Sequence, residues 1–139
     1  NVYDIKKASE IAHEKKVLLM VDGAQAAGCM GVDLSDIDLF AFPGHKGLMA
    51  PMGTGGLYVR EGIDIETIIE GGTGSVSESL LQPYDLPDRF ESGTLNVPAI
   101  FALGESCRYI NKIGIKNICG KDVSLWGCER CFCVKQKTL

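Results

Sequence analysis

The sequence predicts an α/β fold, and three observations support this class. The expected elements follow the order helix, three strands, long loop and helix, which is typical of α/β proteins. The first strand is a continuous apolar run, "VLLMVD" at residues 17–22, as expected of a buried parallel strand. The last helix has an apolar stripe, with Pro98 in its first turn and Gly114 at its end.

The first helix is predicted over residues 2–16, where apolar side chains recur at helical spacing. His13 falls on the more polar flank of this helix, so a solvated histidine is expected there rather than a ligand. The strand at residues 17–22 follows directly. Residues 23–28, "GAQAAG", are then expected to form a loop or a short helical turn.

The second strand is "LFAF" at residues 39–42, and it ends at Pro43. A third strand, "GTGGLYVR" at residues 53–60, follows a glycine-rich turn. Residues 63–72 are compatible with a short helix or an extended piece. The remainder of the segment up to residue 93 is predicted to be loop, and a loop of that length is usually functional or disordered.

The last helix is predicted over residues 97–114. Pro98 suits its first turn, Gly114 suits its end, and Asn96 is placed to cap it. The expected apolar face consists of Ile100, Ala102, Leu103, Cys107 and Ile110.

The composition favours one soluble domain. The chain has 139 residues, of which 45% are hydrophobic and 23% charged, with a formal net charge of −4. This charge gives no basic surface for nucleic acid. The longest apolar run, residues 17–21, is far too short to span a membrane. A cytoplasmic protein that binds neither nucleic acid nor membrane is therefore expected.

Two charged side chains occupy unusual places. Asp22 lies at the end of the first strand, and Lys46 lies within the apolar stretch "AFPGHKGLMAP". Because desolvation favours a neutral amine, Lys46 could act as a nucleophile that forms an imine with an aldehyde. An acid that pairs with a pyridinium nitrogen completes the protein side of pyridoxal phosphate chemistry. From spacing alone, a structural ion pair and two unrelated residues remain alternatives.

Three blocks in order, "VDGAQAAG", "AFPGHKGLMAPMGTGGLYV" and "RFESGTLNVPAI", resemble the class V aminotransferase family. The most similar branch is that of the cysteine desulfurases and selenocysteine lyases. The resemblance implies that residues 1–118 are the central part of a large pyridoxal 5'-phosphate-binding domain of fold type I, with a mostly parallel sheet flanked by helices. Residues 119–139 do not resemble the family and are expected to be a divergent or truncated tail.

The resemblance also implies roles for individual residues. Lys46 matches the Schiff-base lysine, and Asp22 matches the partner of the pyridinium nitrogen. Gln25 matches a hydrogen-bond donor to the phenolic oxygen of the cofactor, and His45 matches a phosphate contact. Thr94 matches a hydroxyl that reaches the phosphate bound in the neighbouring subunit, which implies a homodimer.

The chain also departs from the family pattern. Pro43 stands where the family often has a Ser or Thr phosphate ligand. The family's phosphate loop and the aromatic residue that stacks on the cofactor are not found. The small domain with the substrate-binding arginine and the sulfur-accepting cysteine is not found either. The chain therefore resembles the central third of such an enzyme.

Three smaller features admit plainer interpretations. Thr73, in "EGGTGS", lies in a phosphate-loop-like turn, but such short motifs are weak signals. Arg89 could pair with a carboxylate or be merely structural. The cysteines of "CERCFC" have the spacing of metal ligands, but an altered chain end is preferred and no metal site is predicted; they are Cys128, Cys131 and Cys133.

The predicted function is that of a fragment of a pyridoxal-phosphate enzyme. The whole enzyme would remove sulfur from cysteine, or a cysteine-like amino acid, to give alanine and a persulfide. Another class V activity, such as transamination, is one alternative. A catalytically inactive truncated fragment is the other.

Overall fold

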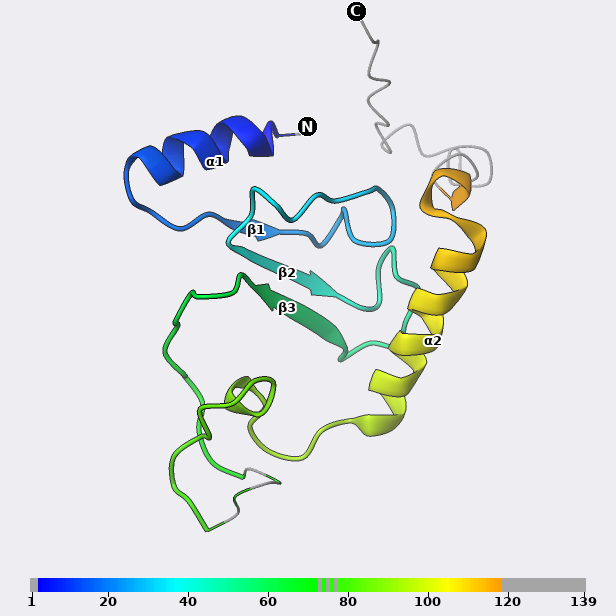
Figure 1. Cartoon of the computed structure of the whole chain (residues 1–139). Coiled ribbons are helices and arrows are strands. Elements are labelled where there is room, and N and C mark those ends of the chain that lie inside the picture. Colours follow the sequence, from blue (N-terminus) through cyan, green and yellow to red (C-terminus); the bar gives the residue numbers. More distant parts are fainter. Residues whose placement is uncertain (1–2, 73, 75, 77, 119–139) are drawn as a thin grey trace, which may run out of the picture.

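The computed structural model describes residues 3–72, 74, 76 and 78–118 (Figure 1). Its elements lie in the predicted order, and the α/β class is confirmed. Thr73, Cys128, Cys131 and Cys133 lie outside the described residues. The elements are α1 (Ile5–Glu14), β1 (Met20–Asp22), β2 (Leu39–Pro43), β3 (Gly55–Val59), a 3₁₀ turn (Asp88–Phe90) and α2 (Val97–Ile113).

Helix α1 is shorter than predicted because Asp4 caps it. The Asp4 Oδ1 atom accepts a hydrogen bond from Lys7 N at 3.0 Å, which satisfies one of the unpaired donors of the first turn. The predicted apolar face is only partly covered, since Ile11 remains 53% exposed.

Strands β1 and β2 are parallel, with Asp22 opposite Ala41. Strand β3 pairs with β2 in the antiparallel direction, so the three-stranded sheet is mixed, with order β1-β2-β3, where a mostly parallel sheet was expected. The cause is the connection through residues 44–54, which contains no helix. A parallel connection needs a crossover of about a dozen residues or more, usually with a helix, whereas an antiparallel strand can return through a loop.

The prediction that residues 17–22 are buried is wrong. Leu18 and Met20 are 50% and 58% exposed, and Leu57 on β3 is 46% exposed. In the described part of the chain β1 is an edge strand, and neither helix packs closely over its open face (Figure 1). Burial of a sheet face depends on what covers it, and an apolar run alone does not supply that cover.

Helix α2 begins and ends as predicted. Asn96 Oδ1 accepts a hydrogen bond from Ala99 N at 3.3 Å, and Gly114, with φ of 85°, ends the helix by donating from its N–H to Ile110 O. Ala99 and Ile110 are buried, whereas Ile100, which was predicted to face the core, is 44% exposed. The buried stripe is therefore rotated slightly from the predicted one.

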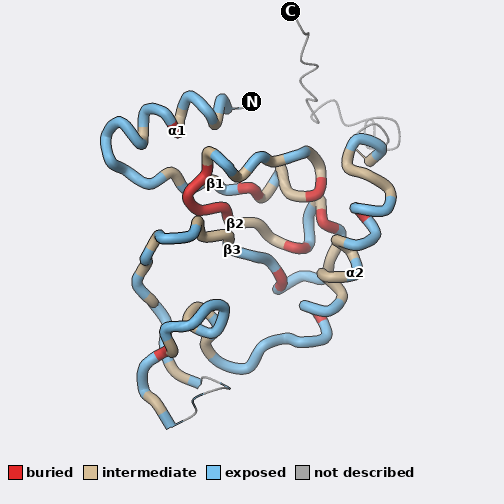
Figure 2. The backbone as a smooth tube through the Cα atoms, viewed as in Figure 1, coloured by how far each residue is buried: buried red, intermediate tan, exposed pale blue. Residues whose placement is uncertain are grey.

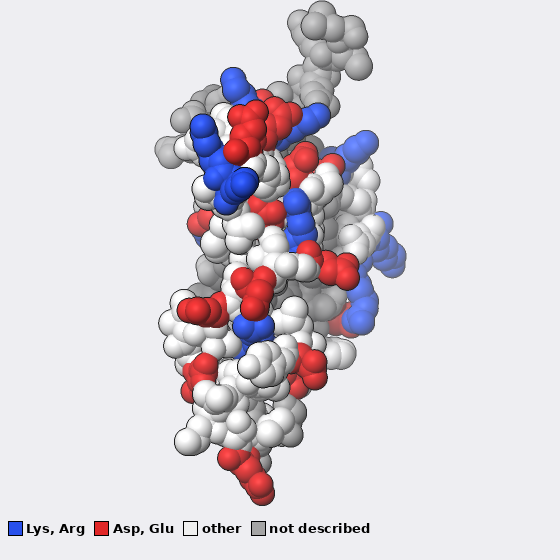
Figure 3. Space-filling view, turned by 60° about the vertical axis from the view of Figure 1, so that its left-hand side comes forward, with Lys and Arg blue, Asp and Glu red and all other residues white. Residues whose placement is uncertain are grey.

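The core is small and lies around β2 and the loops at its ends (Figure 2). The segment 62–93 extends away from the sheet and is mostly exposed (Figures 1 and 2). It contains one 3₁₀ turn among its described residues, and the short helix considered for residues 63–72 is absent, since no helix or strand forms there. On the face in Figure 3, acidic and basic side chains are interspersed.

Candidate active site

The carboxyl ends of β1 and β2 lie at the same edge of the sheet, beside α2 (Figure 1). The parallel register continues past the end of β1, because Gly23 N donates to Ala41 O at 2.7 Å. The turn that follows Asp22 and the loop that follows Pro43 therefore start side by side. Sequence reasoning placed both at strand ends, where α/β sheets bind ligands.

The turn after β1, residues 23–28, is called the Asp22 turn and is held by short-range hydrogen bonds. Asp22 Oδ1 accepts a hydrogen bond from Ala24 N at 2.9 Å, and Gly23 O accepts from Ala26 N and Ala27 N at 3.0 and 2.9 Å. These short-range bonds form the helical turn that was one of the two expectations for residues 23–28. Gln25 projects from this turn and is exposed.

Residues 44–54, which connect β2 to β3 and are called the Lys46 loop, are closed at their base by two backbone hydrogen bonds of Gly44. Its N–H donates to Thr54 O at 2.7 Å, and its carbonyl accepts from Ala50 N at 2.9 Å. Within the loop, Met49 N donates to Lys46 O at 2.8 Å, and Met49 has a left-handed φ of 56°. A residue other than glycine is held in this conformation only by its surroundings.

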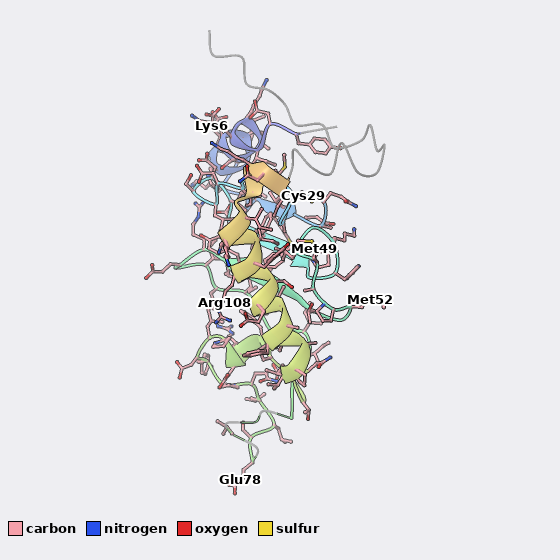
Figure 4. The ribbon with its side chains drawn as sticks, turned by 90° about the vertical axis from the view of Figure 1, so that its right-hand side faces the viewer. Lys6, Cys29, Met49, Met52, Glu78 and Arg108 are labelled. Atoms are coloured by element: carbon pink, nitrogen blue, oxygen red, sulfur yellow. The ribbon has the colours of Figure 1, made fainter. Side chains whose placement is uncertain are left out.

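Helix α2 flanks the Lys46 loop. Met49 lies beside the helix (Figure 4), and its carbonyl accepts a hydrogen bond from Ser106 Oγ at 3.5 Å. A groove of about 360 Å³ lies between them, lined by Met49, Ser106, Glu105 and Tyr109. The loop is thus fixed at its base by the bonds of Gly44 to Ala50 and to Thr54, the residue before β3, and is touched on its flank by α2.

The five predicted site residues are all exposed in this chain; they are Asp22, Gln25, His45, Lys46 and Thr94. The apolar sequence around Lys46 does not bury it. No ion pair joins Lys46 to Asp22 among the described residues. The structure brings the segments that carry four of these residues to one edge, while Thr94 lies on the separate loop that precedes α2.

Hydrogen-bonding groups at this edge have no partner among the described residues. They include the side chains of Gln25, His45 and Lys46, and the second carboxylate oxygen of Asp22. The backbone N–H groups of residues 45–47 also donate to no described acceptor. An amine, an imidazole and three backbone N–H groups form a set of donors suited to an anion.

A second polar cluster, at the opposite end of β2, was missed from the sequence. Asp38 is 2% exposed, and its Oδ2 atom accepts hydrogen bonds from His13 Nε2 at 2.8 Å and Leu19 N at 2.7 Å. Its Oδ1 atom lies 3.2 Å from Arg60 Nη1. His13 is exposed, as expected, but it also bonds to Asp38, which was not expected. The sequence offers one signal for this cluster, because Asp38 is a charged residue directly before the apolar strand β2. The partners of Asp38 lie far away in sequence.

The environment of Asp38 favours its ionised form. Burial acts to raise the pKa of this carboxyl, but the hydrogen bonds from Leu19 N–H and His13, together with the charges of His13 and Arg60, outweigh it and hold the pKa below its usual value. The cluster joins α1, the start of β1, the start of β2 and the end of β3. It therefore organises the end of the sheet opposite the candidate site.

Arg89 is a structural residue, which is the plainer of the two interpretations considered for it. Its Nη1 atom lies 2.7 Å from Asp64 Oδ1, and its Nη2 donates to Ile65 O at 2.9 Å. Its guanidinium also lies over the rings of Tyr84 and Phe90. Arg89 thus holds the segment 62–93 together.

The described residues also bear on two other kinds of site. They contain no group of three or more His, Cys, Asp or Glu residues placed to hold a metal ion. Neither helix in that part of the chain has the length and apolar character required to cross a membrane.

Comparison with known proteins agrees with the geometry. A family model described as aminotransferase class V matches residues 1–125. A probable cysteine desulfurase of Methanothermobacter thermautotrophicus is 43% identical over an alignment of 123 residues, which covers 84% of this chain and 31% of that protein. The chain thus spans about a third of the length of the curated relatives that it matches.

Solved structures give the same result. The apo cysteine desulfurase of Thermococcus onnurineus NA1 is similar with a TM-score of 0.67 and 32% identity, covering 87% of this chain and 32% of that one. The structure of SspA in complex with cysteine gives a TM-score of 0.61 and 26% identity, covering 78% and 28%. Because the family model covers most of the sequence, the chain belongs to the class V aminotransferase family.

Proposed function

We propose that this chain is the central part of a pyridoxal-phosphate enzyme that converts cysteine to alanine and transfers the sulfur to a thiol, which becomes a persulfide. The observation that carries the proposal is the juxtaposition of the Asp22 turn and the Lys46 loop at one edge of the sheet. The relatives named cysteine desulfurases match the stretch that contains both segments. A cytoplasmic location belongs to the same proposal.

The unpartnered groups fit pyridoxal 5'-phosphate. Lys46 would hold the cofactor through Nζ, and Asp22, with one carboxylate oxygen unpaired, would face the ring nitrogen. His45 and the unpaired backbone N–H groups of residues 45–47 supply donors for a phosphate. When bound, the cofactor supplies an electron sink for the carbanion that forms on the substrate.

The residues of this chain then have separable tasks. With the cofactor bound, Asp22 would keep a proton on the ring nitrogen, and Gln25 would donate a hydrogen bond to the phenolic oxygen. The amine of Lys46 would accept and return protons at Nζ. Pro43 offers no side-chain donor, so phosphate binding depends on His45, on backbone N–H groups and on Thr94.

We extend the proposal to assembly and substrate. Residues 1–118 form the central part of the cofactor-binding domain, and residues 119–139 are a divergent tail. In a homodimer, the hydroxyl of Thr94 reaches the phosphate of the neighbouring site. The substrate is an amino acid of the cysteine type, which is supported by the cysteine that SspA holds.

Cofactor binding is tested first with the 139-residue chain. Titration with pyridoxal phosphate is expected to produce the visible absorbance band of a lysine-linked cofactor. Lys46→Ala should abolish the band, whereas Lys6→Ala, an exposed lysine on α1, should leave it unchanged. A band that survives in Lys46→Ala would contradict the assignment of Lys46.

The reaction is tested in a chimera. Residues 1–118 of this chain replace the matching segment of the Methanothermobacter relative, and the chimera is supplied with cysteine and a thiol reductant. Alanine and sulfide are expected in equal amounts, and Lys46→Ala should remove both products. Cofactor binding without sulfide release would instead favour another class V reaction, such as transamination.

A catalytically inactive fragment is the second candidate. The exposure of both Asp22 and Lys46 favours it, because a water-filled site weakens the electrostatic interactions on which catalysis depends. This candidate predicts no absorbance band in the 139-residue chain, so the cofactor titration separates it from the first, whereas the chimera restores the parts outside residues 1–118 and tests the reaction alone.

A further inference from the structure

Two glycines bring the Asp22 turn and the Lys46 loop into direct backbone contact. Gly28, at the end of the turn, is buried and has a φ of 81°. A Cβ atom at Gly28 would lie 2.4 Å from the carbonyl carbon and oxygen of Gly47 and 2.7 Å from Leu48 N. Side chains are never accommodated at such distances, so the absence of a side chain is what allows this approach.

The contact is reciprocal. A Cβ atom at Gly47 would lie 2.4 Å from Ala27 O and 2.4 Å from Cys29 Sγ. Two of the three atoms nearest to this added Cβ, Ala27 O and Cys29 N, are backbone atoms. Backbone atoms cannot move aside as a flexible side chain can. The two segments are therefore packed with no room for even one methyl group on the facing positions.

Not every glycine in this part of the chain is packed so tightly. Gly31, three residues after Gly28, would meet nothing within 4 Å if it carried a Cβ atom, and it does not have a positive φ. Gly23 and Gly44 are also closely packed, but their nearest atoms are side-chain atoms of Phe40 and of Thr54 and Ala50, whereas Gly28 meets the backbone of the other segment.

The two glycines lie close in sequence to two residues of the candidate site. Gly47 directly follows Lys46, and Gly28 lies three residues after Gln25 in the same short turn. Because the side chains of Lys46 and Gln25 are exposed, side-chain packing does not hold them in place. Their backbones, fixed by this contact and by the loop hydrogen bonds, determine where the two side chains start.

We propose that Gly47 is a positioning residue, which through its contact with Gly28 sets the separation between the Lys46 amine and the Gln25 amide. The inference rests on the proposed function for its purpose, because those two groups are meant to reach neighbouring positions of one cofactor ring, the aldehyde carbon and the phenolic oxygen. Placing reacting groups correctly has large effects, and an error of about 1 Å can cost about a hundredfold in rate.

The contact itself is tested without any cofactor. In the isotope-labelled wild-type chain, a nuclear Overhauser effect is expected between the Gly28 Hα protons and the Leu48 amide proton. In Gly47→Ala, amide signals of residues 24–29 should shift, whereas Gly31→Ala should leave those of residues 45–49 unchanged. The absence of the wild-type effect would overturn the proposal, and this result does not depend on whether any variant folds.

The positioning role is tested by cofactor affinity. Gly47→Ala should weaken the binding of pyridoxal phosphate by about tenfold to a hundredfold, while Gly31→Ala binds as wild type. Adding Cys29→Ala to Gly47→Ala removes the sulfur atom that faces the new methyl group and should restore part of the affinity. Wild-type affinity in Gly47→Ala would overturn the proposal. No binding by the wild type would instead refute the proposed function, and the nuclear Overhauser effect would still decide the contact.

Discussion

The buried carboxylate of Asp38 provides a direct test of what holds this fold together. Asp38→Asn keeps the size of the side chain but removes its charge and one acceptor. The native carboxylate accepts from Leu19 N at 2.7 Å and His13 Nε2 at 2.8 Å and lies 3.2 Å from Arg60 Nη1. An asparagine amide would place an N–H donor against at least one of these donors.

The expected loss follows from the burial of each partner. A hydrogen bond to a charged group contributes about 1.5–3 kcal/mol, and breaking a fully buried pair costs about 3–5 kcal/mol. The side chains of His13 and Arg60 are 41% and 32% exposed, so both can turn to water, which reduces their share. We therefore expect Asp38→Asn to lower the free energy of unfolding by about 2–4 kcal/mol.

Urea unfolding of the 139-residue chain, followed by circular dichroism at neutral pH, measures this change. Asp36→Asn is the matched control, because it makes the same change of charge two residues away, where Asp36 has no partner among the described residues. The control should change the free energy of unfolding by about 0.5 kcal/mol or less. If Asp38→Asn unfolds at the same urea concentration as Asp36→Asn, the structural role assigned to the cluster is refuted.

Three further predictions concern stability. Gly104→Ala should raise the free energy of unfolding by about 0.5–1 kcal/mol in the same urea assay, because Gly104 lies inside α2 with nothing within 4 Å of an added Cβ; a loss would contradict that open space. Asn96→Ala should cost about 1 kcal/mol through loss of the cap on Ala99 N, and an unchanged urea midpoint would argue against the cap. Because the pKa of Asp38 is lowered in the folded chain, its contribution is complete above the unfolded pKa of 3.8 and is lost as pH falls through the lower folded value. An acid titration should therefore show wild type losing stability below pH 3.8 more steeply than Asp38→Asn.

Local signals in the sequence predicted local structure well. The ends of α2 were foreseen because Asn96 and Gly114 act within one turn of their own positions. The exposure of residues 17–22 was not predicted, because the burial of a strand depends on the elements that pack over it, and no described helix packs over this one. The Asp38 cluster was missed because His13 lies 25 residues away from Asp38, and no periodicity connects them.

The candidate site was predictable only in part. The strand ends carrying Asp22 and Lys46 could be placed at one edge of the sheet, and the parallel register confirms this arrangement. The roles of the individual side chains came from the resemblance to a family, and they remain predictions. The contact between Gly28 and Gly47 could not be predicted, because nothing in a sequence distinguishes a glycine required by packing from one in open space.

The central claim is that Lys46, and no other lysine, binds pyridoxal phosphate covalently. The direct measurement is to incubate the chain with the cofactor, reduce with borohydride, digest with protease and locate the pyridoxyl group by mass spectrometry. We expect one labelled peptide, containing Lys46, at a cofactor concentration that leaves Lys6 and Lys7 unlabelled. Label spread over all exposed lysines, with Lys46 no more reactive than those of α1, would contradict it.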